Sequence, residues 1–102
     1  MAGEQLTQLL AWVAPRAAAA PEALRRRVVE HIEQTTALPD PAATLAAAGR
    51  RALERVALHP GDRSVALDLL AADGLITLAL LHRAEHAPAT LAAFARELQG
   101  AS

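Results

Sequence analysis

The sequence of 102 residues contains no cysteine, no tyrosine, no lysine and no asparagine, and its only aromatic residues are one tryptophan and one phenylalanine. Without cysteine, the chain forms neither a disulfide scaffold nor a zinc–thiolate site. So few aromatic side chains offer no stacking platform for nucleic-acid bases, and a net charge of −1 offers no basic surface to a phosphate backbone. We therefore expect no nucleic-acid partner.

Apolar residues make up 53% of the chain, and alanine and leucine dominate them. This composition is typical of a folded protein rather than a disordered one, and the length predicts a single domain over 1–102 with a radius of gyration of roughly 13 Å. The use of arginine in place of lysine is typical of a GC-rich bacterial genome. No basic residue precedes Arg16, so we expect no secretory signal and a cytoplasmic location.

Apolar residues recur at helical spacing, and no sustained alternation predicts a strand. The expected helices cover about 4–13, 21–35, 41–58, 63–86 and 88–98. We therefore predict an all-α fold, a compact bundle of four to five helices with a central, strongly apolar fourth helix. The most apolar segment, 65–81, contains two aspartates, so we interpret it as a core helix and expect no membrane span.

Several residues predict where these helices begin, end or bend. Pro15 is expected to end the first helix. Asp40 and Asp62 are expected to cap the third and fourth helices. Gly49 lies beside the apolar stripe of the third helix, where a small residue lets another helix approach closely. Gly74 lies inside the fourth helix and leaves open a kink or break there.

The sharpest chemical motif is His82-Arg83-Ala84-Glu85-His86. It resembles the H-x-x-E-H pattern of inverted zincin proteases, in which two histidines bind zinc and the glutamate is the general base. The resemblance covers these five residues alone, and the only later acid that could add a ligand is Glu97. Basic residues in the last turn of a helix are also favoured by the helix dipole. We prefer this second interpretation and keep His82, Glu85 and His86 as candidate metal ligands.

Two further groups of polar residues have structural interpretations. Asp68 and Asp73 lie about 140° apart around the fourth helix, so they do not form a catalytic carboxylate pair. At least one of them is expected to be partly buried and paired with arginines of the second and third helices. His31 is expected at the surface or at a boundary. The chain has no nucleophile motif and no phosphate-binding loop, so we expect no enzyme activity and no cofactor.

The fourth helix is apolar around its whole circumference, and a chain of this length has few other helices to cover it. We therefore expect a non-enzymatic interaction protein, either a homo-oligomer or an accessory subunit that binds another protein. Charge reversal at Leu70 or Leu78 should then give a soluble monomer. The candidate interface residues are Leu9, Trp12, Leu70, Leu78 and Leu81.

Two alternatives remain open at this point. One is a metal-binding protein or zinc-dependent hydrolase that uses His82, Glu85 and His86. The other is a helical bundle that binds a small molecule in an apolar pocket, with a carboxylate such as Asp73 inside it.

Overall fold

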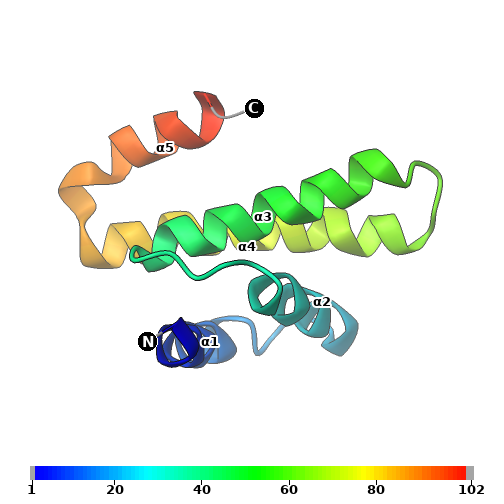
Figure 1. Cartoon of the computed structure of the whole chain (residues 1–102), viewed down its shortest axis with the longest axis horizontal. Coiled ribbons are helices and arrows are strands. Elements are labelled where there is room, and N and C mark those ends of the chain that lie inside the picture. Colours follow the sequence, from blue (N-terminus) through cyan, green and yellow to red (C-terminus); the bar gives the residue numbers. More distant parts are fainter. Residues whose placement is uncertain (1, 101–102) are drawn as a thin grey trace.

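A hairpin of two long helices, α3 (Pro41–Leu58) and α4 (Ser64–His86), forms the centre of the molecule. In this computed structural model, which describes residues 2–100, α1 (Ala2–Arg16) and α2 (Glu22–Glu33) lie on one side of the hairpin (Figure 1). The chain then turns through η1 (Pro88–Thr90), and α5 (Leu91–Gly100) folds back over the end of α4. Residues 2–100 contain no β-strand. The predicted all-α bundle with a central fourth helix is confirmed.

The core forms where the apolar faces of the α-helices meet, as the helical spacing predicts. The radius of gyration is 13.1 Å, close to the expected value. The larger buried side chains of the core are Leu9, Val13, Val28, Ile32, Leu45, Leu75 and Phe94.

Small residues let α3 and α4 pack closely along the hairpin. Ala48 and Ala52 of α3 and Ala71 and Ala72 of α4 are all buried. A Cβ atom at Gly49 would lie 2.9 Å from Ile76 Cδ1, which is too close for the present packing. The predicted close approach at Gly49 is therefore confirmed.

The cap predicted at Asp40 is confirmed, whereas the N-cap of α4 is Arg63, so Asp62 lies one residue before the predicted position. One predicted helix end is wrong. Asp40 Oδ1 accepts a hydrogen bond from the Ala42 amide at 3.1 Å, and Asp62 Oδ1 accepts one from the Ser64 amide at 2.9 Å. However, α1 continues through Pro15 to Arg16. The proline lies in the last turn, where its missing N–H removes one hydrogen bond from a helix that is already ending.

Helix α4 runs unbroken through Asp73 and Gly74, so the open question of a kink is settled in favour of a continuous helix. By length and composition alone α4 could cross a membrane, a test that core helices of soluble proteins also pass. Only 28% of its most apolar window is buried within the molecule. Much of the apolar surface of α4 therefore faces outward.

Candidate functional site

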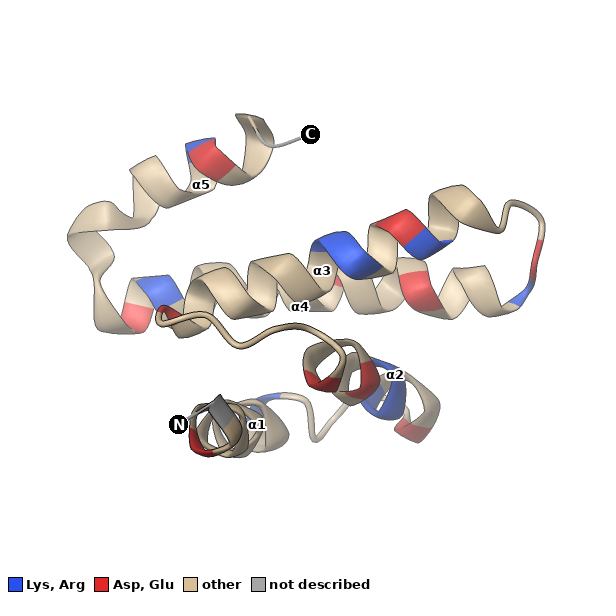
Figure 2. Ribbon diagram, viewed as in Figure 1, with Lys and Arg blue, Asp and Glu red and all other residues tan. Residues whose placement is uncertain are grey.

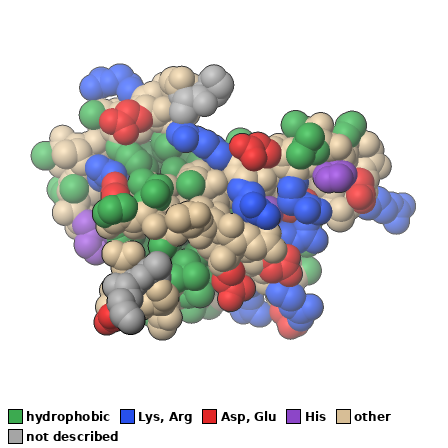
Figure 3. All heavy atoms as spheres, in the orientation of Figure 1, with side chains coloured by type: hydrophobic (Ala, Val, Ile, Leu, Met, Phe, Trp, Pro, Cys, Tyr) green, Lys and Arg blue, Asp and Glu red, His purple; other side chains and the backbone are tan. Residues whose placement is uncertain are grey.

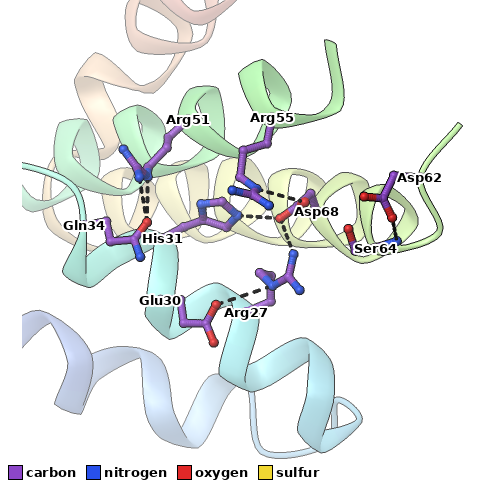
Figure 4. A network of polar contacts seen from close by, with 9 residues as sticks. All are labelled: Arg27, Glu30, His31, Gln34, Arg51, Arg55, Asp62, Ser64 and Asp68. Atoms are coloured by element: carbon purple, nitrogen blue, oxygen red, sulfur yellow. Dashed lines mark hydrogen bonds and ion pairs between the residues drawn. The ribbon is translucent and has the colours of Figure 1, made fainter. Parts of the chain in front are cut away.

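Asp68 lies where α2, α3 and α4 meet, and its side chain is completely buried. Arg27 Nη1 donates a hydrogen bond to Asp68 Oδ1 at 2.7 Å, and His31 Nε2 lies 2.8 Å from the same oxygen. Arg55 Nε donates to Asp68 Oδ2 at 3.3 Å (Figure 4). We call these four residues the Asp68 cluster. The prediction that a buried aspartate pairs with arginines of the second and third helices is confirmed.

The burial of His31 was not expected. Its side chain is only 2% exposed, so the prediction of a surface or boundary position is wrong. His31 lies about 60° from Val28 around α2, on the inward face of the helix. An ionised carboxylate only accepts hydrogen bonds, so His31 Nε2 is the donor to Asp68. His31 Nδ1 has no hydrogen-bond partner among the described residues.

The Asp68 cluster holds three helices together and encloses the Asp68 carboxylate. Burial alone would raise the pKa of Asp68, but the hydrogen bonds from Arg27, His31 and Arg55 outweigh it and hold this pKa below its usual value. Both carboxylate oxygens have partners and the side chain has no contact with solvent. The carboxylate therefore stays ionised and enclosed, which is the behaviour of a structural ion pair.

The motif at the end of α4 places its residues away from a common centre. The rings of His82 and His86 stack with centroids 4.0 Å apart, so they lie face to face rather than directing nitrogen atoms at one point. Glu85 Oε1 instead accepts hydrogen bonds from Arg16 Nη2 at 3.0 Å and Trp12 Nε1 at 3.3 Å. Within residues 2–100 no three His, Asp or Glu side chains are grouped so that they could hold a metal ion. This geometry gives the zinc-hydrolase hypothesis no support.

An apolar groove of about 500 Å³ runs between α3 and α4, in the half of the hairpin nearer its turn. Leu53, Leu69 and Leu70 in its walls are 45%, 52% and 56% exposed. We call this surface the leucine groove, and its lining residues are Leu53, Leu69, Leu70, Ala72, Asp73 and Ile76. Hydrophobic side chains also reach the surface at the turn end of the hairpin (Figure 3).

The predicted interface residues are distributed between this groove and the core. Leu70 lines the groove, and Leu81 is exposed outside it. Leu9 is 5% exposed because it lies on the α1 face that packs inward, so its side chain does not reach the surface. Leu78 is half-buried against the core, and Trp12 is half-buried beside His82. A substitution at Leu78 would therefore disturb the core as well as the surface.

Asp73 lines the leucine groove, and Arg50 lies one helical turn before the groove residue Leu53 on α3. The charged residues of α3 lie in its C-terminal half (Figure 2). Among them, Arg50 is exposed and makes no hydrogen bond or ion pair within residues 2–100. It directly follows Gly49, the residue that packs against Ile76 of α4. The Asp73 carboxylate lines the groove and also lacks a partner in this part of the chain. An unpaired anion thus lines the groove, and an unpaired cation lies one helical turn from its Leu53.

The chain matches no protein-family model, no curated protein and no solved structure. Its function is therefore inferred from its own geometry.

Sequence reasoning missed Leu53, Leu69 and Arg50 as surface residues of interest. The helical pattern marks leucines as candidates for burial, but it does not show which of them the neighbouring helices cover. The all-round apolarity of α4 is the signal that such a surface exists. The location of the surface depends on which segments pack against α3 and α4.

Proposed function

We propose that this chain is a non-enzymatic helical interaction protein that forms a homodimer through its leucine groove. The observation that supports this proposal is the exposure of Leu53, Leu69 and Leu70 side by side in one apolar groove. Contiguous apolar surface in contact with water is unfavourable, and in soluble proteins it is typical of contact sites. Each leucine gains free energy when a partner removes its exposed side from water.

The charges at the groove favour a second copy of the chain as the partner. A two-fold interface brings residue i of one copy to residue j of the other, and residue j to residue i. Arg50 and Asp73 are unpaired and opposite in charge, so a two-fold arrangement pairs each Arg50 with the Asp73 of the other copy. The same surface is then self-complementary in charge as well as in hydrophobicity. Because the groove is small, we expect a reversible dimer with a dissociation constant on the order of micromolar.

Substitution of Leu70 by arginine tests the proposal. Leu70 is 56% exposed, so Leu70→Arg should leave the fold intact while it places a charge in the apolar contact. We expect sedimentation velocity to give a dimer for the wild-type chain of 10.7 kDa and a folded monomer for Leu70→Arg. Leu58→Arg is the matched control, because Leu58 is 74% exposed but lies outside the groove.

Two results would count against the dimer. A Leu70→Arg chain that still dimerises would show that the contact lies elsewhere. A wild-type chain that stays monomeric and sediments with lipid vesicles would assign the exposed surface of α4 to a membrane, since α4 is long and apolar enough for that environment.

A further inference from the structure

A cavity of about 320 Å³ lies between α1, the connection from α2 to α3, and the end of α4. It is at the opposite end of the hairpin from the turn and does not include any residue of the leucine groove. Its size is at the lower end of the range for small-molecule sites in proteins. The lining residues that matter for binding are Gln5, Gln8, Trp12, Ala37, Leu38 and His82.

The α1 wall of the cavity is fixed by contacts behind it. Trp12 Nε1 donates a hydrogen bond to Glu85 Oε1 at 3.3 Å, and the Arg16 guanidinium lies 4.0 Å from the centre of the Trp12 ring. Arg16 also pairs with Glu85 at 3.0 Å. On the cavity side, the His82 ring meets Trp12 edge-on with centroids 4.8 Å apart. Contacts from both α1 and α4 therefore fix the orientation of the Trp12 indole.

The opposite wall is fixed as well. Thr44 Oγ1 accepts a hydrogen bond from the Leu38 amide at 2.9 Å, and Pro39 and Pro41 restrict the backbone on either side of Asp40. Asp40 caps α3 and also pairs with Arg83 of α4. Because both walls are formed in advance, a ligand would lose little affinity to the ordering of the protein.

The charges around the cavity argue against an ionic ligand. None of the lining residues is an Asp, Glu, Lys or Arg, and nearby charges are paired as Arg16–Glu85 and Arg83–Asp40. Burial lowers the pKa of His82, and the neighbouring His86 lowers it further, so the site favours the neutral imidazole. A neutral imidazole offers one donor and one acceptor nitrogen.

The polar groups that face the cavity can bind a small number of ligand atoms. The His82 ring and the side-chain amides of Gln5 and Gln8 have no hydrogen-bond partner among residues 2–100. The remaining walls are apolar and include an aromatic ring and two prolines. Such walls suit a flat ring, because rings pack well against aromatic edges and proline faces.

We propose that this cavity is a binding site for a small, neutral aromatic compound that carries one hydrogen-bonding substituent. This inference is independent of the dimer, since the two sites share no residue.

The probe 4-fluorophenol tests this proposal, because it is neutral at pH 7 and consists of one ring with one hydroxyl group. Trp12 is the only tryptophan, so the chain has a single indole N–H signal in a ¹H–¹⁵N spectrum. We expect this signal to shift and saturate, with a dissociation constant on the order of millimolar for so small a compound. The charged analogue 4-fluorobenzoate should bind at least about tenfold more weakly.

The Ala37→Leu variant locates the site. Ala37 lines the cavity and is half-buried, so a larger side chain there fills space that the probe would occupy. We expect at least about tenfold weaker binding of 4-fluorophenol, whereas Ala57→Leu, at an exposed position of α3 outside the cavity, should leave binding unchanged. If Ala37→Leu does not fold, nuclear Overhauser contacts between the probe and the Trp12 and Leu38 protons in the wild-type chain give the same information.

Three results would overturn the proposal. The first is no saturable shift of the Trp12 signal up to the solubility limit of 4-fluorophenol. The second is equal binding of 4-fluorobenzoate, which would contradict the neutral class of ligand. The third is unchanged binding to a folded Ala37→Leu variant, or Overhauser contacts to other residues, which would place the probe outside this cavity.

Discussion

Asp68 is the residue whose side chain connects the most helices, because it accepts hydrogen bonds from α2 and α3 while it belongs to α4. A buried carboxylate is unfavourable unless it is fully paired, and here three donors satisfy it. The partly exposed guanidinium groups of Arg27 and Arg55 keep contact with water at their outer edges. The arrangement therefore buries the Asp68 carboxylate and the His31 ring while both guanidinium groups stay partly exposed.

Replacement of Asp68 by asparagine should destabilise the protein strongly. The isosteric amide removes the negative charge and leaves Arg27 and His31 without their ionic partner. We expect Asp68→Asn to lower the free energy of unfolding by about 3 kcal/mol, the lower end for a broken buried ion pair, because Arg55 remains accessible to water. In a Leu70→Arg background, where association does not contribute, Asp73→Asn on the exposed side of α4 should change it by less than about 0.5 kcal/mol. Urea unfolding measures both, and equal effects would contradict a structural role for the cluster.

The lowered pKa of Asp68 also predicts how stability depends on pH. A carboxyl group with a lower pKa in the folded chain than in the unfolded chain stabilises the fold at pH values above its unfolded value of 3.8. That contribution is lost as the pH falls below 3.8 and through the folded pKa. We expect urea midpoints of the wild-type chain to fall more steeply with decreasing pH below about pH 4 than those of Asp68→Asn. Parallel curves for the two proteins would contradict the assignment.

At the level of the helices, sequence reasoning placed most boundaries because proline and aspartate act locally. Asp40 and Pro41 begin α3 and Asp62 precedes α4, and each effect involves only neighbouring backbone groups. The burial of His31 could not be predicted in this way, because it depends on an aspartate 37 residues later in the chain. The position of α5 depends on side-chain packing against the end of α4, including the Arg83 guanidinium 4.2 Å from the centre of the Phe94 ring.

For the candidate sites too, some features follow from the local sequence and others depend on how distant segments pack. The pairing of Asp68 with arginines was predictable, since a carboxylate among leucines needs partners and the chain has few other cations. The leucine groove and the cavity beside Trp12 were not, because each is formed by segments far apart in the sequence. The motif at His82 was visible in the sequence, but the role of Glu85 as a partner of Arg16 and Trp12 required the packing of α1.

Two glycines in the paired helices should respond differently to alanine. A Cβ atom at Gly74 would meet nothing within 4 Å, so Gly74→Ala should raise the free energy of unfolding by about 1 kcal/mol through helix propensity alone. Gly49→Ala gains the same propensity but must displace Ile76, whose Cδ1 would lie 2.9 Å from the new Cβ. We expect a smaller gain or a net loss there. Thermal unfolding in a Leu70→Arg background isolates these effects from association, and a larger gain at Gly49 would contradict the packing.

At the scale of the whole molecule, the hairpin has more apolar surface than the other α-helices of residues 2–100 cover. Helices α1 and α2 cover one side, whereas α5 covers the end away from the turn and leaves the leucine groove open (Figure 1). The amino-acid pattern of α4 therefore indicates a contact with something beyond the single chain. A two-fold dimer would cover the groove and would also pair Arg50 with Asp73.

The most direct test of this dimer is a charge exchange across its two-fold axis. In a dimer of Arg50→Glu chains, each of the two charge contacts holds two carboxylates. In a dimer of Asp73→Arg chains, each contact holds two guanidinium groups. Because like charges repel, each variant alone should dimerise at least about tenfold more weakly than the wild-type chain. In an equimolar mixture, the introduced glutamate of one chain meets the introduced arginine of the other, and the native pair remains at the second contact. Light scattering over a dilution series should therefore give monomers of 10.7 kDa for each variant alone and twice this mass for the mixture. Equal masses for the two variants and their mixture at every concentration would contradict the account.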